Sequence, residues 1–416
     1  MNYILKTLIF EGLGIRFTLF HDLNAFKASQ NFKINYSALL IEDCFQIMPH
    51  GILFDHGIRD YPLEVIADAD FLKVFMRSSA GDLPFDFFAA SFWLLSRYEE
   101  HLPHKADHYN RFSFRSSLAY QYNFMQVPLV NLWLQVFKNK LLKRSPRLSF
   151  TNHKYSFLST IDIDNAYQYK YKGFVRTMAG ILSDKRLSKT KERLKIILGF
   201  KNDPFDCYDF LIQTHQQNQI NALFFILLGD YGPNDKNHSA SDLRFQSLIK
   251  HLKDYAMVGI HPSFGSNKTS RQLQVEVHRL SSITHSLTTQ SRQHFSMLKF
   301  PDTYQNLLQA GINADYSMGY TNYNGFRASY CYPFKWYSLE NEATTPLTIH
   351  PFCLSENTLL SQTKNNHQLM LQQSKELIDE VKKYQGECIS IFHNDNFDKA
   401  LNDFYTDFLK MAKTAD

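Results

Sequence analysis

From about residue 150 onward, short apolar runs alternate with stretches of helical periodicity, and this alternation most constrains the fold. Strands that alternate with helices favour a parallel sheet covered by helices. We therefore expect an α/β fold, a deformed seven-stranded (β/α) barrel, while an open doubly wound sheet remains the alternative. The expected strands are residues 156–161, 222–228, 257–260, 293–298, 312–316, 347–351 and 388–392. The expected helices between them are residues 205–219, 241–255, 270–287, 302–310 and 367–384.

The first 150 residues lack this alternation, and a chain of 416 residues is too long for one ordinary core. We expect residues 1–150 to form a smaller α/β N-terminal domain and residues 151–416 to form the barrel. In the N-terminal domain we expect strands at 3–10, 15–20 and 34–41, helices at 85–98 and 127–142, and a linker at 138–146. The polar segments 96–100 and 107–112 are expected to be solvated helix ends, with a binding patch as the alternative.

Composition excludes several classes of function. The chain has 45 basic and 40 acidic residues and no long basic run, so we expect no nucleic-acid partner. No apolar run is long enough to predict a membrane span. The five cysteines form no CxxC pair, which favours free thiols in a reducing compartment. Together with the absence of a leader-like N-terminus, this predicts a cytoplasmic protein.

Two carboxylates one residue apart follow the first expected strand of the barrel. Alternation along a strand would place Asp162 and Asp164 on the same face. A carboxylate at the end of an apolar strand is costly unless it is paired with a metal, an arginine or a proton to transfer. One such Asp often caps a helix, but a pair on one face is better explained by a functional site.

Other expected strands also end in residues that can ligate metal or transfer protons. His261 follows the third strand, Arg292 and His294 flank the start of the fourth, Asp315 closes the fifth and His393 ends the last. In (β/α) barrels the active site forms at the carboxyl ends of the strands. Each residue alone could be a satisfied core group, but their shared position predicts one site.

In this order, these residues resemble the motifs of the polysaccharide deacetylase family (NodB-homology, carbohydrate esterase type). The resemblance covers about residues 155–400 and is most distinctive in Gly311–Tyr320 and Gly325–Arg327. It resembles in particular a bacterial subfamily with an extra, uncharacterised N-terminal domain. By this resemblance Asp162 would be the general base, with Arg292 holding it, and Asp164 and His261 would be metal ligands. His393 would be the general acid, oriented by Asp315.

The resemblance departs at two motifs, of which the third has Gln293-His294-Phe295 where the family usually has a proline and an aromatic residue. The departure in the second motif affects the metal ligands. The family has a second histidine four residues after the first, where this chain has Gly265. A catalytic zinc site generally needs three protein ligands and an open position. We expect His294 to restore the count, so that Asp164, His261 and His294 bind a divalent metal, zinc being the expected ion. The alternative is that the degenerate motif leaves the chain without a metal.

The resemblance therefore implies a metal-dependent hydrolase that removes an N-acetyl (acyl) group from an amino sugar or a polysaccharide precursor, acting on a C–N amide bond. The partner would be a carbohydrate substrate. The alternative is a non-catalytic carbohydrate-binding or scaffold protein with a degenerate deacetylase barrel. The paired carboxylates favour the enzyme, because they would repel each other without a cation or proton between them.

Overall fold

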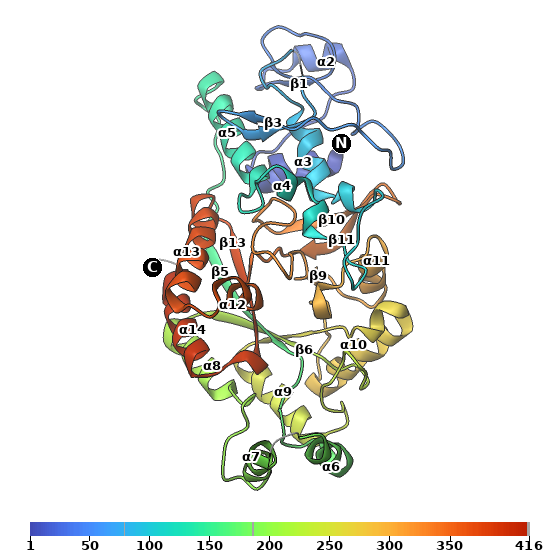
Figure 1. Ribbon diagram of the computed structural model, residues 1–416. Coiled ribbons are helices and arrows are strands. Elements are labelled where there is room, and N and C mark those ends of the chain that lie inside the picture. Colours follow the sequence, from blue (N-terminus) through green and yellow to red (C-terminus); the bar gives the residue numbers. More distant parts are fainter. Residues whose placement is uncertain (79, 185–186, 414–416) are drawn as a thin grey trace.

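A curled sheet of nine strands organises the C-terminal part of the chain (Figure 1). The computed structural model describes residues 1–78, 80–184 and 187–413. The strands lie in the order β10-β11-β9-β8-β7-β6-β5-β13-β12, and all neighbours are parallel except β10 and β11. Over the residues described, the two edge strands do not pair, so the sheet is an open half-barrel. Its strands are β5 (Ser156–Ile163), β6 (Asn221–Ile226), β7 (Met257–Ile260), β8 (Gln290–Ser291), β9 (Ala314–Asp315), β10 (Phe334–Ser338), β11 (Ala343–Ile349), β12 (Leu354–Ser355) and β13 (Glu387–His393).

The expected α/β class is confirmed, but the count of seven strands is wrong because β10 and β12 are additional. The two-residue β12 is too short to produce a sequence period. The strand expected at residues 293–298 is also wrong. The chain leaves the sheet after Ser291 and forms a 3-10 turn at His294–Ser296, in which Phe295 has φ 57°.

Helices with one apolar face cover this sheet, as their periodicity predicts. Asp242 caps one of them by accepting a hydrogen bond from the backbone N–H of Arg244 at 2.8 Å. The five expected helices all form: α8 (Tyr208–Asn218), α9 (Leu243–Tyr255), α10 (Ser270–Thr284), α11 (Asp302–Gln309) and α13 (His367–Lys383). The structure adds α6 (Gly173–Ser183), α7 (Leu187–Ile197), α12 (Glu356–Thr363) and α14 (Lys399–Ala412).

The N-terminal region, residues 1–150, contains more helix than expected. Residues 3–10 form α1 (Asn2–Leu5) and a π-helix (Lys6–Gly12) instead of a strand, because a short apolar run does not distinguish the two. Residues 15–20 form no strand. The stretch expected as a linker lies mostly within α5, a helix that runs to Arg144. The remaining elements are α2 (Leu23–Ala28), α3 (Phe87–Leu95), α4 (Leu118–Gln121), α5 (Leu129–Arg144), β1 (Ile34–Tyr36), β2 (Phe45–Ile47), β3 (Ile66–Asp68) and β4 (Leu72–Val74).

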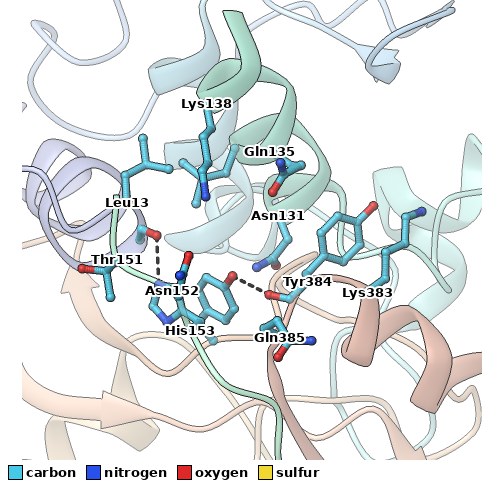
Figure 2. A pocket seen from close by; sticks show the side chains of 13 residues that line it. Leu13, Asn131, Gln135, Lys138, Thr151, Asn152, His153, Lys383, Tyr384 and Gln385 are labelled. Atoms are coloured by element: carbon cyan, nitrogen blue, oxygen red, sulfur yellow. Dashed lines mark hydrogen bonds between the residues drawn. The ribbon is translucent and has the colours of Figure 1, made fainter. Parts of the chain in front are cut away.

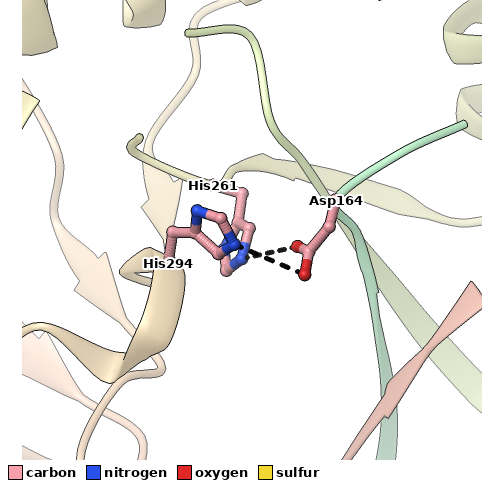
Figure 3. Close-up of side chains that lie close together, drawn as sticks. All are labelled: Asp164, His261 and His294. Atoms are coloured by element: carbon pink, nitrogen blue, oxygen red, sulfur yellow. Dashed lines mark ion pairs between the residues drawn. The ribbon is translucent and has the colours of Figure 1, made fainter. Parts of the chain in front are cut away.

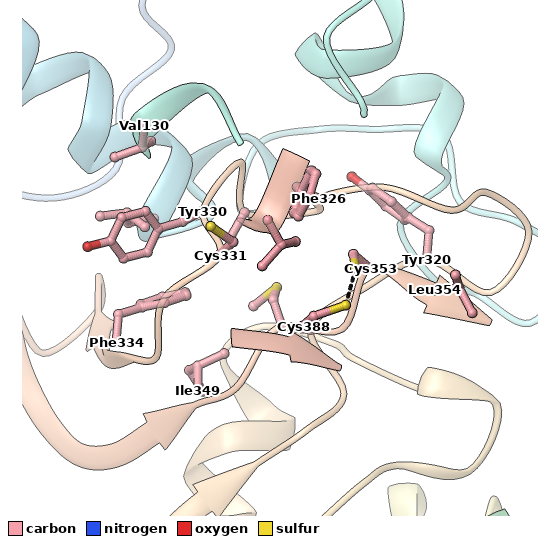
Figure 4. Packing of buried hydrophobic residues seen from close by; sticks show 14 of the residues in the cluster. Val130, Tyr320, Phe326, Tyr330, Cys331, Phe334, Ile349, Cys353, Leu354 and Cys388 are labelled. Carbon is pink, nitrogen blue, oxygen red and sulfur yellow. Dashed lines mark hydrogen bonds between the residues drawn. The ribbon is translucent and has the colours of Figure 1, made fainter. Parts of the chain in front are cut away.

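One continuous hydrophobic core joins the N-terminal region to the sheet. The rings of Tyr3 and Tyr337 lie 4.9 Å apart across the junction. Figure 4 shows Val130 of α5 beside Tyr330 and Cys331. All five cysteines are buried and free, and the Sγ atoms of Cys353 and Cys388 lie 4.0 Å apart. None of the helices in the described ranges is both long and apolar enough to cross a bilayer.

Buried ion pairs also cross the junction, where a solvated helix end was expected. Arg97 and Glu100 are 1% and 5% exposed. Glu100 accepts from Arg97 Nε at 2.8 Å and from Arg327 Nε at 2.9 Å. The expectation for residues 96–100 is therefore wrong: these charges are buried because Arg327 of the C-terminal part supplies a second partner for the carboxylate.

A cavity of about 320 Å³ opens at the same junction, between α5 and the end of α13 (Figure 2). The rings of His153 and Tyr332 stack at 4.2 Å in its wall. His153 is fixed by a 2.9 Å hydrogen bond between its Nε2 and the carbonyl oxygen of Gly12. This cavity contains none of the expected site residues.

Candidate metal centre and active site

The carboxyl ends of β5, β7 and β13 bring most of the expected site residues into one cavity of about 370 Å³. Parallel strands place these ends at the same edge of the sheet. Four of the expected residues line the cavity: Asp162, Asp164, His294 and His393. Arg292 and His261 lie directly behind them and contact Asp162 and Asp164.

Asp164, His261 and His294 offer three ligand atoms within 4.8 Å of one another (Figure 3). His261 Nε2 lies 3.2 Å from Asp164 Oδ1, and His294 Nε2 lies 3.4 Å from Asp164 Oδ2. Asp164 Oδ1 and His261 Nε2 are buried without a hydrogen-bond partner among the residues described. Two buried, unpartnered acceptor atoms that face each other suit a shared cation, so the three residues fit a divalent metal.

The outer nitrogens of both imidazoles have acceptors of their own. His261 Nδ1 lies 2.6 Å from the carbonyl oxygen of Arg292, and His294 Nδ1 lies 3.0 Å from Asp235 Oδ1. If each Nδ1 carries the proton, each Nε2 presents its lone pair to Asp164. Metal-ligating histidines are commonly held in this way, with the other ring nitrogen bonded to a carbonyl oxygen or a carboxylate.

His294 and Asp164 each favour the charged form of the other. Burial disfavours both charged forms, but the imidazoles of His294 and His261 hold the pKa of Asp164 well below its ordinary value. Burial likewise opposes charge on His294, yet Asp164 and Asp235 raise its pKa to about 9. The carboxylates therefore make this a place where positive charge is stabilised.

Gly265, which stands where the resemblance would place a second histidine, binds Asp235 through its backbone. The backbone N–H groups of Phe264 and Gly265 donate to the two carboxylate oxygens of Asp235 at 2.8 and 3.1 Å. A Cβ at Gly265 would lie 2.9 Å from Gln272 Nε2. Gly265 thus fixes, through the backbone, the carboxylate that orients His294, and His294 supplies the second imidazole.

Arg292 forms a buried ion pair with Asp162. It is fully buried, its Nη1 lies 3.2 Å from Asp162 Oδ1, and its Nε donates to the carbonyl oxygen of Tyr316 at 3.0 Å. The same Nη1 bonds the hydroxyl of Thr160. Burial lowers the pKa of Arg292 against the opposing effect of Asp162. Asp162 Oδ2 is left to face the cavity, 3.9 Å from both His261 Nε2 and His393 Nε2.

Glu356, rather than Asp315, orients His393. His393 Nδ1 lies 2.6 Å from Glu356 Oε1, and this carboxylate raises the pKa of His393 well above its usual value although burial opposes the charge. Asp315 is buried on β9 and accepts from the hydroxyls of Ser291 and Ser317, each at 2.8 Å. The expected role of Asp315 is therefore wrong, because four strands of the sheet separate β9 from β13.

Sequence reasoning missed three contributions to this site. Asp235 follows β6 at a distance along the loop, and Glu356 begins α12 directly after the unpredicted β12. The third is a segment of the N-terminal region, from which His108, Tyr109 and Arg111 line the cavity. The binding patch weighed as the alternative for residues 107–112 fits their position better than a solvated helix end.

Comparisons with known proteins give one family match, at the N-terminal region. Residues 1–146 match the model of a family of unknown function, DUF7033. The comparison with curated proteins gives no match.

Similar solved structures cover a little under two thirds of the chain. A candidate polysaccharide deacetylase from Mycobacterium smegmatis has 11% identity and a TM-score of 0.40, over 64% of this chain and 88% of that one. A family 4 carbohydrate esterase from Streptomyces lividans, in complex with acetate, has 11% identity and a TM-score of 0.31, over 63% and 88% of the two chains. A family 4 pseudoenzyme from Bacillus anthracis has 9% identity and a TM-score of 0.33, over 62% and 61%. The function proposed below is argued from the residues of this site.

Proposed function

We propose that this chain is a metal-dependent hydrolase that removes an N-acetyl group from an amino sugar or a polysaccharide precursor. The observation that carries the proposal is the group Asp164, His261 and His294, placed between a carboxylate held by an arginine and an imidazole held by a carboxylate. A divalent metal such as zinc, held by these three residues, would supply Lewis-acid polarisation of the acyl carbonyl and of the attacking water.

Asp162 is the residue placed to accept the proton of that water. Arg292 binds one carboxylate oxygen, which fixes the orientation of the group, and the other oxygen faces the cavity. A base must lie within reach of the proton that it removes, and Asp162 lines the cavity beside Asp164.

His393 is the residue placed to protonate the departing amine. Glu356 accepts the Nδ1 proton, which leaves Nε2 directed toward Asp162 across the cavity. Although burial opposes the charge, Glu356 raises the pKa of His393 and so favours the protonated form that a general acid requires. The acid and the base thus come from the neighbouring strands β13 and β5.

The alternative function, non-catalytic carbohydrate binding, accounts for fewer of these contacts. It needs neither a third ligand at His294 nor a carboxylate behind His393.

We also propose that the chain divides into two domains near residue 150. We further propose a cytoplasmic location, which the five free cysteines support.

Acetate release from N-acetylated chitooligosaccharides by the zinc-loaded protein tests the proposal. We expect Asp162→Asn and His393→Gln each to lower kcat by about 100-fold or more, the usual contribution of a positioned acid or base. Asp230→Asn is the matched control, since this exposed residue lies outside the cavity. Acetate release that is unchanged in both site variants would refute the mechanism.

A further inference from the structure

A second cavity, of about 170 Å³, adjoins the candidate active site, and the N-terminal region forms one wall of it. The N-terminal segment 107–115 faces the loop that follows β9 across this cavity. The residues that line both cavities, and so mark their connection, are His108, Arg111, Ser296, Thr321 and Asn322.

Guanidinium groups dominate the charge of this second cavity. Arg111, Arg115 and Arg327 line it, whereas Asp107 is the acidic residue in its wall. Asp107 is already engaged, because it accepts from Arg111 Nε at 2.8 Å and from the backbone N–H groups of Tyr109 and Arg111 at 2.9 and 3.0 Å. Its carboxylate is therefore poorly placed to repel an anion in the cavity.

The three guanidinium groups differ in how far their charge is compensated. Arg327 is paired with Glu100, and Arg111 with Asp107. Arg115 is exposed, stacks on Phe114 at 5.2 Å and forms no ion pair within the described ranges. Arg115 thus brings an uncompensated positive charge to the wall.

Arg111 connects the second cavity to the catalytic one. It is 7% exposed, and its partners are Asp107 and the carbonyl oxygen of Phe295, which its Nη1 contacts. An arginine carries five N–H donors in a fixed plane, so these partners leave donors for a ligand. Planar donors of this kind suit the oxygens of carboxylates and phosphates.

We propose that the second cavity binds an anionic oxygen group, a carboxylate or a phosphate, carried by the acylated sugar whose amide lies at Asp164, His261 and His294. This inference rests on the proposed function and gives the N-terminal region a role in it. Residues 107–115 complete the substrate site and select a charged amino sugar over a neutral one. The recognition element is Arg115 together with the free donors of Arg111.

Calorimetric titration of the full, zinc-loaded chain with three probes tests the inference. The probes are N-acetylglucosamine, which is neutral, N-acetylglucosamine 1-phosphate and N-acetylmuramic acid, which carries a carboxylate. We expect at least one charged probe to bind about tenfold more tightly than the neutral one, as a charge-assisted hydrogen bond allows. The charged probe that gains affinity identifies the anionic group, and the gain should shrink as salt is added.

Arg115→Gln should reduce the preference for the charged probe about fivefold. Arg147→Gln is the matched control, because it removes the same charge from an exposed arginine outside both cavities and should leave the preference unchanged. Equal affinity for all three probes, or equal effects of the two substitutions, would overturn the inference. Acetate release without charge preference would refute this subsite alone, whereas charge preference without acetate release would refute the hydrolase.

Discussion

Asp235 and His294 form a pair at the candidate metal centre. Asp235 Oδ1 lies 3.0 Å from His294 Nδ1, while the same carboxylate accepts the backbone N–H groups of Phe264 and Gly265. The backbone at Gly265 thus positions, through Asp235, the imidazole of His294. By the proposed function, Asp235 is a positioning residue, since it would act on the metal through His294.

Replacing Asp235 should weaken metal binding without abolishing it. We expect Asp235→Asn to lower the zinc affinity by about 10- to 100-fold, the usual effect of removing a carboxylate that orients a metal-ligating histidine. Competition with a zinc-binding dye measures this affinity. Asp230→Asn is the control, because Asp230 lies in the same loop but pairs with Arg279 at the surface. The same affinity in both variants would show that Asp235 does not orient a ligand.

Glu356 should set the alkaline limit of activity. Its carboxylate raises the pKa of His393, so Glu356→Gln should lower that pKa and move the alkaline limb of the kcat profile toward lower pH. Profiles of kcat against pH for both proteins measure the shift. Glu387→Gln is a matched control, because Glu387 pairs with His350, outside the cavity, at 2.8 Å. An unmoved limb in Glu356→Gln would exclude His393 as the general acid.

Protonation of Glu100 should lower the stability of the folded protein at acidic pH. Although burial opposes ionisation, Arg327 and Arg97 lower the pKa of Glu100 to about 2. A carboxyl group whose pKa is lower in the folded state than in the unfolded state stabilises the folded protein, and this stabilisation is fully present above the unfolded pKa. For Glu100 it is lost as the pH falls through the folded pKa of about 2.

The lost stabilisation should be on the order of 3 kcal/mol, at 1.36 kcal/mol for each pKa unit. Urea unfolding between pH 5 and pH 2 tests this by comparing the wild type with Glu100→Gln. The wild type should lose more stability over this range, and Glu342→Gln, which alters an exposed ion pair, should behave like the wild type. A Glu100→Gln curve parallel to that of the wild type would contradict the prediction.

The part of the site that was predicted from sequence lies on strands. Asp162 lies near the end of β5, Asp164 and His261 directly follow β5 and β7, and the parallel order of β5, β6 and β7 fixes their relative positions. His294 was predicted from spacing to an arginine, although the surrounding segment is a turn and not the expected strand.

The residues that were missed depend on contacts that leave no period in the sequence. Glu356 reaches His393 because the two-residue β12 places the start of α12 beside β13. Arg111 reaches the catalytic cavity because the N-terminal region packs on the sheet through a shared core. Such long-range packing is set by the folded chain as a whole, so residue patterns alone did not predict it.

Zinc stoichiometry tests the central claim most directly. After zinc loading and removal of unbound metal, elemental analysis should find about one zinc per chain in the wild type, as expected for a three-ligand site. His294→Ala should lose the metal, and His350→Ala, which removes a histidine outside the cavity, should retain it. A wild type that binds no metal, or a His294→Ala variant that binds as tightly as the wild type, would contradict the centre formed by Asp164, His261 and His294.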